Sequence, residues 1–547
     1  MKATIAEALR RALERVGVSD AVVELEHPAE LKNGDYATGT ALRYAKAAGT
    51  NPRALAEKLV AEVGPIEGVE KVEIAGPGFI NFFLAKAAFA KAIDRARESE
   101  AWGKNASLDG KKVMVEYTDP NPFKEFHIGH LMSNAIGESV ARLIEMSGAR
   151  VVRANWQGDV GQHVAKAIWG KMQQPELSWG AAYTYGSEHY EAHKEAIDTI
   201  NKQVYDHTDP AINELYERGR RESLEHFEAI YKILGTKFDF YFFEGIEGME
   251  GPKIVREFLE KGVFAESDGA VIFPGEKYGL HTRVFLTSKG LPTYEAKELG
   301  LNRAKFEKVP DLNESIIVTA SEQSDYFKVV LKAMEFVMPK VAEKTTHVAH
   351  GMMRFAEGKM SSRKGNVITG ESLIEDLTEA AQARARESRA ADPEGLAQSI
   401  AVAAIKYQIL KQGAGKDIIF DRERALSLEG DSGPYLQYAH ARAAGVMERA
   451  RSEGIEAKLD PNAEATDLVR TLHRFPDALA YAAEKLEPHL LVNHLIELAS
   501  AFNSWYAQVH ILDGSSEAPH KLAIVDAVRA TLEKGLWTLG IPAPQQM

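Results

Sequence analysis

The sequence predicts a multidomain α/β protein, in which a parallel-sheet domain with a helical insertion stands between an α+β module and an all-α domain. A strand, a helix and a second strand follow one another within about 40 residues after position 110, which is typical of a parallel βαβ unit. The segment before this unit mixes helix and strand patterns, whereas the chain beyond Glu371 carries helix patterns alone. The length of 547 residues suits about three or four domains.

Composition places the chain among globular proteins. Hydrophobic residues make up 45% of it and charged residues 27%, a mixture that can bury large cores. The net charge of −13 disfavours indiscriminate binding to nucleic acid or anionic membrane, although a local basic groove is compatible with it. Without cysteine, disulfides and thiolate-bound zinc are excluded, so we expect no structural zinc. An acidic residue among the first nine and the lack of a long apolar run predict a cytoplasmic protein without membrane contact.

Residues 1–108 are expected to form the α+β module. Apolar residues recur at steps of three and four over 5–16, which indicates an amphipathic helix. A polar stretch with glycines at 103–110 marks the boundary to the next domain. The other patterns of the module are strands at 21–25, 69–74 and 79–84 and a helix at 53–63.

The parallel sheet is expected in residues 109–375, as a Rossmann-like domain. A long polar helical stretch interrupts its α/β pattern, and we interpret this stretch as an insertion at about 165–270. Residues 376–547 are expected to form the all-α domain. The expected elements of the sheet domain are strands at 112–117 and 151–154 around a helix at 131–146, and strands that resume at 271–273, 284–286 and 316–318.

The most informative local pattern is Pro-Asn-Pro-Phe-Lys-Glu-Phe-His-Ile-Gly-His at 120–130, between a buried strand and the start of a helix. Parallel sheets bind ligands at the carboxyl ends of their strands, and a helix N-terminus offers free N–H groups to an anion. His127 and His130 are three residues apart and lie on one face of the first turn. Gly129 has no side chain to hold a flat base away. Taken alone, the pattern fits a nucleotide site and two surface histidines in a loop about equally well.

A second pattern, Gly-Lys-Met-Ser-Ser-Arg-Lys-Gly at 358–365, holds three cations and two hydroxyls between glycines. Lysine and arginine neutralise phosphate charge that develops in a transition state, and serine hydroxyls add donors. A solvated basic loop is the alternative. The segment is not a Walker A loop, because Met360 follows the lysine where Ser or Thr is required. The glycines at 76 and 78 lack the third glycine of a dinucleotide fingerprint.

Together these two patterns resemble the ATP-binding signatures of class I aminoacyl-tRNA synthetases. The surrounding sequence most resembles the arginyl-tRNA synthetase family, over nearly the whole chain. Within 158–161, Val160 replaces an expected Trp, so we assign that loop no contact. The segments that carry the likeness are 33–36 and 75–81 near the N-terminus, 116–121, 158–161 and 292–298 around the site, and 431–442 in the helical region.

The resemblance implies an ATP-dependent ligase that activates L-arginine to arginyl adenylate and transfers it to the 3′ end of tRNA(Arg). The implied partners are tRNA(Arg), L-arginine and ATP, with Mg²⁺ accompanying the ATP, and a monomer is expected. The enzyme would accelerate this reaction by positioning the substrates and stabilising the charge on the phosphates. The residues implied to act on the phosphates are Lys124, His127, His130, Lys359 and Arg363. Further ATP contacts are implied for Gly129, Met353, Ser361 and Ser362.

A planar guanidinium is best held by carboxylates in a fork and by other acceptors. Glu116 ends the first strand of the sheet, so its carboxylate can face the site, and a solvated strand end is the alternative. The resemblance adds Tyr294 and Glu298 as partners of the guanidinium, although the family usually carries Asp at the last position. It also implies that Asn121 and Gln323 hold the α-amino and carboxylate groups of the amino acid.

The resemblance also implies tRNA contacts at both ends of the chain. Phe79 and Asn81 would contact tRNA from the N-terminal module, or they would close a strand. Tyr435, Tyr438 and Arg442, at helical spacing, would stack on splayed anticodon bases, or they would cover the core of the helical domain.

Three other functions stand as alternatives. A lysyl or cysteinyl synthetase is the nearest, and the absence of cysteine disfavours the cysteinyl enzyme with its thiolate-bound zinc. A nucleotidyltransferase that uses no tRNA would leave the two end domains unexplained. A non-catalytic RNA-binding relative is disfavoured because His127, His130 and Lys359 are all present.

Overall fold

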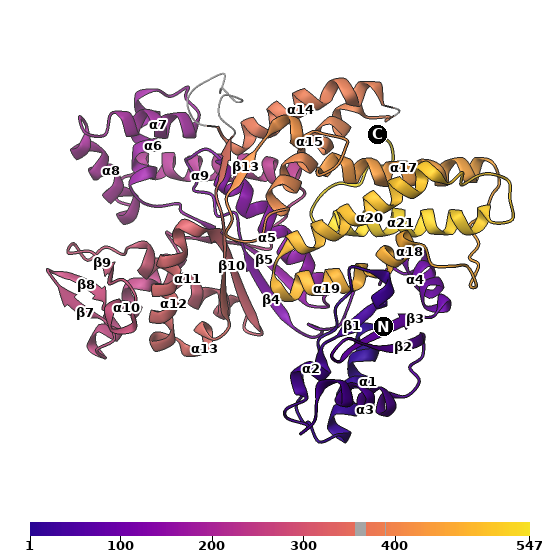
Figure 1. Cartoon of the computed structure of the whole chain (residues 1–547). Helices are drawn as coiled ribbons and strands as arrows, with labels where there is room; N and C mark the ends of the chain where they lie inside the picture. The colour runs from indigo at the N-terminus through magenta and orange to yellow at the C-terminus, as the bar shows by residue number, and fades with distance from the viewer. Residues whose placement is uncertain (356–367, 389) are drawn as a thin grey trace.

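A five-stranded parallel sheet lies at the centre of the molecule (Figure 1). The structure is a computed structural model that describes residues 1–355, 368–388 and 390–547. In the described chain the strand order is β11-β10-β4-β5-β6, and every neighbouring pair is parallel, as predicted. The strands are β4 (Lys112–Glu116), β5 (Arg150–Gln157), β6 (Phe240–Phe243), β10 (Glu314–Ala320) and β11 (Thr345–His350).

The predicted first βαβ unit is confirmed. Strand β4 leads to helix α5 (Ile128–Met146), which returns the chain to β5, and the two strands pair in parallel. The sequence patterns do not predict β6, because a run of four aromatic residues shows no periodicity. This strand falls within 165–270 and extends the main sheet beside β5, so that part of the range is not an insertion.

Strand β4 is buried on both faces. Val113 and Val115 belong to the core that α5 covers, whereas Met114 belongs to a core that includes Leu301 of helix α11 (Tyr294–Lys308). Because side chains alternate along a strand, Glu116 is directed toward the α11 side. The end of β4 therefore presents a carboxylate to the layer that contains α11.

Four helices between β5 and β6 form the predicted helical segment, at the upper left of Figure 1. They share a hydrophobic core that contains Trp179, Tyr216 and Phe123. Phe123 comes from the loop after β4, so these helices pack on the chain that leads to the two histidines. The four helices are α6 (Gln162–Gln173), α7 (Trp179–Glu188), α8 (Lys194–Asp206) and α9 (Pro210–Leu234).

The strands at 271–273 and 284–286 do not resume the parallel sheet, so that expectation is wrong. They are β8 (Ala270–Phe273) and β9 (Arg283–Leu286), and with β7 (Ala265–Ser267) they form a separate antiparallel sheet. Their connections are too short for a parallel pair, which needs a crossover of a dozen or more residues. The strand at 316–318 is β10, as predicted. The nearby helices are η2 (Glu247–Glu250), α10 (Gly251–Glu260), η3 (Gly275–Tyr278), η4 (Ser321–Gln323), α12 (Ser324–Val337) and α13 (Pro339–Ala342).

The N-terminal module contains a three-stranded antiparallel sheet of order β1-β3-β2. The predicted strand at 21–25 is wrong, because Val22 is 56% exposed and that stretch is irregular. The first strand is instead Tyr36–Thr38, whose three residues are all buried. The other predicted elements of the module are confirmed. They are α1 (Lys2–Arg15), α3 (Pro52–Val63), β2 (Val69–Ala75) and β3 (Phe79–Leu84), accompanied by η1 (Leu31–Asn33), α2 (Thr40–Tyr44) and α4 (Lys86–Glu98).

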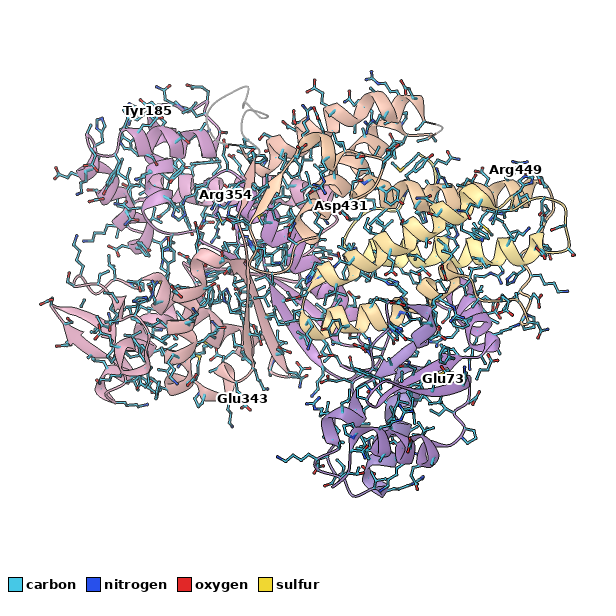
Figure 2. All side chains as sticks on the ribbon, in the orientation of Figure 1. Glu73, Tyr185, Glu343, Arg354, Asp431 and Arg449 are labelled. Atoms are coloured by element: carbon cyan, nitrogen blue, oxygen red, sulfur yellow. The ribbon has the colours of Figure 1, made fainter. Side chains whose placement is uncertain are left out.

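Beyond the sheet the described chain is helical, as predicted, apart from β13 (Ile418–Phe420), which pairs with β12 (Met353–Phe355). Arg354 of β12, labelled in Figure 2, forms an ion pair with Asp417 at 3.0 Å. No helix in the described part of the chain is long and apolar enough to cross a membrane. The helices are α14 (Gly370–Glu387), α15 (Pro393–Leu410), α16 (Arg422–Ala425), α17 (Gly433–Ser452), α18 (Asp467–His473), α19 (Phe475–Lys485), α20 (Pro488–Gln508) and α21 (Ala518–Thr538).

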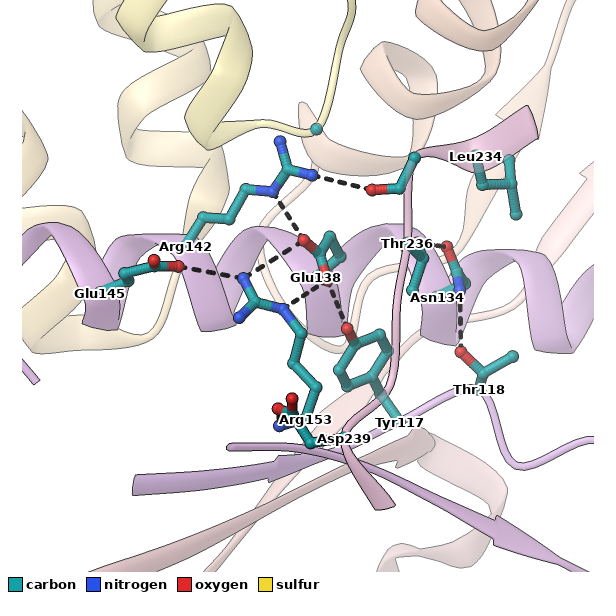
Figure 3. A network of polar contacts seen from close by, with 12 residues as sticks. Tyr117, Thr118, Asn134, Glu138, Arg142, Glu145, Arg153, Leu234, Thr236 and Asp239 are labelled. Carbon is teal, nitrogen blue, oxygen red and sulfur yellow. Dashed lines mark hydrogen bonds and ion pairs between the residues drawn. The ribbon is translucent and has the colours of Figure 1, made fainter. Parts of the chain in front are cut away.

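A buried polar network fastens α5 to the sheet and to α21 (Figure 3). Glu138 of α5 accepts hydrogen bonds from the Tyr117 hydroxyl, from Arg142 Nε (2.6 Å) and from Arg153 Nε (3.0 Å). Arg142 Nη1 also donates to the carbonyl of Trp537, in α21, at 2.6 Å. Helix α5 therefore holds a fixed position between the sheet and the C-terminal helices.

Candidate active site

The two predicted histidines stack at the N-terminus of α5. Their ring centroids are 3.4 Å apart, with 24° between the ring planes. His127 Nδ1 accepts from the His130 backbone N–H (3.4 Å), and His130 Nδ1 accepts from the His127 backbone N–H (3.2 Å). This reciprocal arrangement is a capping box at the first turn of α5. A Cβ on Gly129 would lie 3.0 Å from the His127 ring, so glycine leaves room for the stack.

Burial favours the neutral form of both imidazoles. Desolvation and the charge of Lys124 lower the pKa of His127, and burial with the neighbouring positive groups lowers the pKa of His130 well below its usual value. Lys124 itself lies with Nζ 5.0 Å from the ring centre of Tyr183. Neutral rings beside one lysine and the positive end of α5 form a corner suited to phosphate oxygens.

The loop between β4 and α5 has a strained backbone. Thr118, Asp119 and Phe123 have φ angles of 81°, 47° and 70°, a region that side-chain-bearing residues rarely adopt. Other elements hold the loop: Ser133 Oγ accepts from the Thr118 N–H (2.9 Å), and Asp119 Oδ1 accepts from the Trp156 N–H (2.7 Å). Strain of this kind is concentrated at functional sites, and no motif in the sequence signals it.

Two predicted acidic residues meet at the end of β4. Glu116 is 1% exposed and Glu298, on α11, is 4% exposed. Lys305 Nζ lies 2.8 Å from Glu116 Oε2, and Asn302 Nδ2 donates to Glu298 Oε1 (3.0 Å). We call Glu116, Asp119, Glu298 and Lys305 the acidic cluster. Its α11 members lie on one helix face, seven residues apart.

The carboxylates of the acidic cluster outnumber its lysine. Burial and the negative charge of Glu116 raise the pKa of Glu298 to about 7. The same two causes raise the pKa of Asp119 well above its usual value. A bound cation would favour the ionised form of both groups. The acidic cluster therefore has the electrostatics to bind a cationic side chain.

The other predicted contacts of the amino acid follow the carboxyl ends of strands or begin α11. Asn121 is half-buried after β4, and a Cβ on Gly158, after β5, would overlap its Oδ1. Gln323 is exposed in η4, directly after β10. Tyr294 is 64% exposed at the start of α11, where its carbonyl accepts from the Tyr326 hydroxyl of α12 (3.1 Å).

Buried cations of this region were missed by the sequence patterns. They are Lys305 and Lys297, the second of which forms an ion pair with Glu244 at 2.7 Å. The spacing of Lys305 from Glu298 is two helical turns, and this could have indicated a shared face.

The structure describes the residues on either side of the second motif. Met353 is half-buried in β12. After the motif, Thr369 forms an antiparallel bridge with His127, and the Gly370 N–H donates to the Phe126 carbonyl (2.8 Å). The chain that follows the motif is thus tied to the histidines. The whole motif at 358–365, and with it the predicted contacts Lys359, Ser361, Ser362 and Arg363, lies outside the described residues.

Two of the predicted tRNA contacts lie together on α17. The Arg442 guanidinium carbon is 4.6 Å from the ring centre of Tyr438 and 5.0 Å from that of Tyr506 on α20. Arg442 Nη2 also donates to the Tyr438 hydroxyl (3.1 Å). Tyr506 is 38% exposed and belongs to no recognised motif. One cation between two aromatic rings is a surface on which bases can stack.

The remaining predicted tRNA contacts differ in exposure. Tyr435 packs against the hydrophobic core of the helical region. Asn81 is 4% exposed within β3, whereas Phe79 is 38% exposed at the start of that strand. Of these three residues, Phe79 has the freely accessible side chain.

Known proteins match the whole chain. Residues 93–422 match the family of class I (R) tRNA synthetases, catalytic domain, residues 1–84 match the arginyl tRNA synthetase N terminal domain, and residues 436–547 match the DALR anticodon binding domain. An arginine–tRNA ligase from Clostridium acetobutylicum is 30% identical over 570 residues and is covered, like this chain, to 100%. One from Clostridium botulinum is 32% identical over 550 residues, covering 96% of this chain and 97% of the relative.

Solved structures share the fold. The arginyl-tRNA synthetase of Thermus thermophilus superposes with a TM-score of 0.86 at 26% identity, covering 100% of both chains. That of Plasmodium falciparum has a TM-score of 0.81 at 20% identity, covering 99% of this chain and 98% of the other. The parallel sheet, the histidine pair at its edge and the matched catalytic domain define a class I aminoacyl-tRNA synthetase. Within that class, the chain belongs to the arginyl-tRNA synthetase family.

Proposed function

We propose that this protein activates L-arginine with ATP to arginyl adenylate and transfers the arginyl group to the 3′ end of tRNA(Arg). Family membership supports the activity. One structural relationship supports its location: the loop that leaves β4 begins at buried Glu116 and ends at the stacked histidines. Ligands of open parallel sheets bind at that edge.

In the first step, an oxygen of the arginine carboxylate attacks the α-phosphorus of ATP. The bond from that phosphorus to the bridging oxygen breaks, and pyrophosphate leaves with its electron pair. Preorganised donors and cations stabilise the charge that develops on the phosphate oxygens. We assign this role to Lys124, His127, His130, Lys359 and Arg363. We assign further ATP contacts to Gly129, Met353, Ser361 and Ser362.

The arginine side chain enters the acidic cluster in this proposal. Its guanidinium has five N–H donors, for which Glu116, Glu298 and the Tyr294 hydroxyl are acceptors. Asn121 and Gln323 hold the α-amino and carboxylate groups. A neutral or shorter side chain would leave buried carboxylates unpaired, which allows discrimination of ~10⁴-fold or more without an editing domain.

In the second step, a ribose hydroxyl of the terminal nucleotide attacks the arginyl carbonyl carbon, and AMP leaves. We assign residues 1–108 to tRNA contact, 109–375 to catalysis and 376–547 to anticodon binding. The side chains assigned to tRNA contact are Phe79, Asn81, Tyr435, Tyr438 and Arg442.

We expect ATP to bring Mg²⁺ with it, because phosphate oxygens are the ligands that this cation prefers. Within the described residues, no group of three or more histidine and carboxylate side chains could hold a metal ion by itself. We also propose that the protein acts as a monomer in the cytoplasm, where arginine, ATP and tRNA are present.

Isotope exchange between pyrophosphate and ATP tests the proposed function. The protein receives ATP, labelled pyrophosphate and one amino acid at a time, with and without tRNA. Label should enter ATP when arginine is present, and citrulline, its neutral analogue, should give none. Exchange driven by lysine, citrulline or another amino acid in place of arginine would overturn the proposal.

A further inference from the structure

Lys305 takes no part in the reaction described so far, yet it connects the two halves of the acidic cluster. It is 0% exposed, and its Nζ lies 2.8 Å from Glu116 Oε2 and 3.5 Å from Asn302 Oδ1. Asn302 in turn donates to Glu298 Oε1 at 3.0 Å. A continuous polar chain therefore leads from Glu298 through α11 to the end of β4.

The contact between Lys305 and Glu116 supplies charge without a well-directed hydrogen bond. Among the described residues, no donor of suitable geometry reaches the buried Glu116 Oε2. A buried acceptor without such a partner is costly and calls for an explanation. The ammonium lies beside the Glu116 carboxylate, and Oε2 can still accept an N–H from a ligand.

Charged groups from several elements act on this pair of carboxylates. Glu244 is neutralised by Lys297 at 2.7 Å, and burial keeps the Tyr326 phenol neutral by raising its pKa. Within the described residues, Lys305 is the cation that remains to offset the acidic cluster. The titratable groups that face Glu116 and Glu298 are Asp119 after β4, Glu244 after β6, Tyr326 on α12, and Lys305.

We propose that Lys305 is a positioning residue for arginine: it fixes Glu116 and leaves the pair Glu116 and Glu298 one cation short, so that the substrate guanidinium completes the charge balance. This inference rests on the proposed function, because it places the guanidinium between the two carboxylates. In the free protein a proton on Glu298 takes the place of the missing cation. Arginine displaces that proton to solvent.

The test compares how the KM for arginine depends on pH in the wild-type protein, Lys305→Met and Lys308→Met. Lys308 is a matched control, because it lies on the same helix, has a 44% exposed side chain and pairs with a different carboxylate, Glu247 (2.6 Å). Lys305 opposes the raised pKa of Glu298. Its loss should move the pH profile upward by about 1–3 pH units, so that KM for arginine at pH 7 rises about tenfold or more. KM for ATP should not change.

The outcomes separate this inference from the proposed function. If the wild-type protein shows no arginine-dependent exchange, the proposed function fails. If it does and Lys305→Met keeps the wild-type KM and pH profile, the inference fails. If Lys305→Met does not fold, Lys305→Gln replaces it, because glutamine keeps N–H donors but lacks the charge. A raised KM and a shifted pH profile again support the inference, and wild-type values again contradict it.

A measurement on the wild-type protein needs no variant. Calorimetric titration with arginine at pH 7, in buffers of different ionisation enthalpy, counts protons exchanged on binding. The inference predicts proton release to the buffer. Binding of arginine without proton release would overturn it.

Discussion

Glu116 and Tyr117 are consecutive residues whose polar ends meet partners in different layers of the molecule. The Glu116 carboxylate lies 2.8 Å from Lys305 on α11, whereas the Tyr117 hydroxyl donates to Glu138 on α5. One strand end thus joins the acidic cluster to the network of Figure 3. The geometry of the site and the attachment of α5 therefore depend on the same few residues.

Replacing Glu138 by Gln should destabilise the fold. Burial opposes its charge, but Arg142 and Arg153 hold the pKa of Glu138 below its usual value. Its contribution is therefore present above the usual glutamate pKa and is lost as pH falls through the lowered value. The substitution leaves two arginines without their buried partner, at a cost of roughly 3–5 kcal/mol. Urea unfolding at neutral pH measures the loss.

Glu145→Gln is the matched control for that substitution. Glu145 also pairs with Arg153 (3.1 Å), but its side chain is 45% exposed. An exposed pair contributes about 1 kcal/mol or less. Equal shifts of the unfolding midpoint in the two variants would contradict the role given to Glu138.

The KM for arginine should depend on pH through Glu298. Burial and Glu116 raise the pKa of Glu298 to about 7, so the free protein holds a proton there below that pH, and a guanidinium needs the ionised form. KM should rise about tenfold for each pH unit below about 7 and level off above it. Exchange kinetics at saturating ATP measure this. Glu298→Gln should raise KM and flatten the profile, and a flat profile in the wild-type protein would count against the assignment.

Gly158→Ala should impair arginine binding. A Cβ at this position would overlap Asn121 Oδ1 and lie 3.4 Å from Glu244 Oε1, so the Asn121 side chain must move. Overpacking of this kind costs about 1–3 kcal/mol, which corresponds to a rise of about 5- to 150-fold in KM for arginine. Gly445→Ala is the control, since a Cβ there meets nothing within 4 Å. The same KM in both variants would show that Asn121 does not bind the amino acid.

Arg442→Ala should weaken tRNA binding and spare amino-acid activation. The side chain lies between the rings of Tyr438 and Tyr506, and loss of a stacked base contact costs about 1–3 kcal/mol. Aminoacylation kinetics should show a higher KM for tRNA, with unchanged KM for arginine and ATP. Arg449→Ala, at an exposed position further along α17 (Figure 2), is the comparison. If it weakens tRNA binding equally, the contact is not specific to the aromatic pair.

Local patterns predict strands and helices well where one element follows another, as in the unit of β4, α5 and β5. They do not specify partners, and this is why β8 and β9 were expected in the main sheet although they pair with each other. The apolar stretch at 21–25 is not a strand, because an exposed Val22 faces no core. Strand β6 is not predicted, because a run of four aromatic residues has neither the alternation of a strand nor the periodicity of a helix.

Local patterns identified Glu116, His127 and His130 because these residues lie at fixed spacings around the end of one strand, whereas Glu298 was predicted from the family resemblance of the segment 292–298. Local patterns do not identify Lys305, because its contact with Glu116 forms only when α11 packs against β4. Contacts between elements far apart in the sequence leave no local pattern. The strained φ angles after β4 belong to the same class, since neighbouring elements impose them.

A crystal structure with arginine and a non-reactive ATP analogue tests the central claim most directly, namely that the acidic cluster and the histidine pair serve one active site. The account predicts guanidinium nitrogens within about 2.7–3.2 Å of the Glu116 and Glu298 carboxylates. It also predicts phosphates against His127 and His130, with the arginine carboxylate facing the α-phosphorus. A guanidinium bound away from the acidic cluster, or an ATP analogue in a separate cavity, would contradict it.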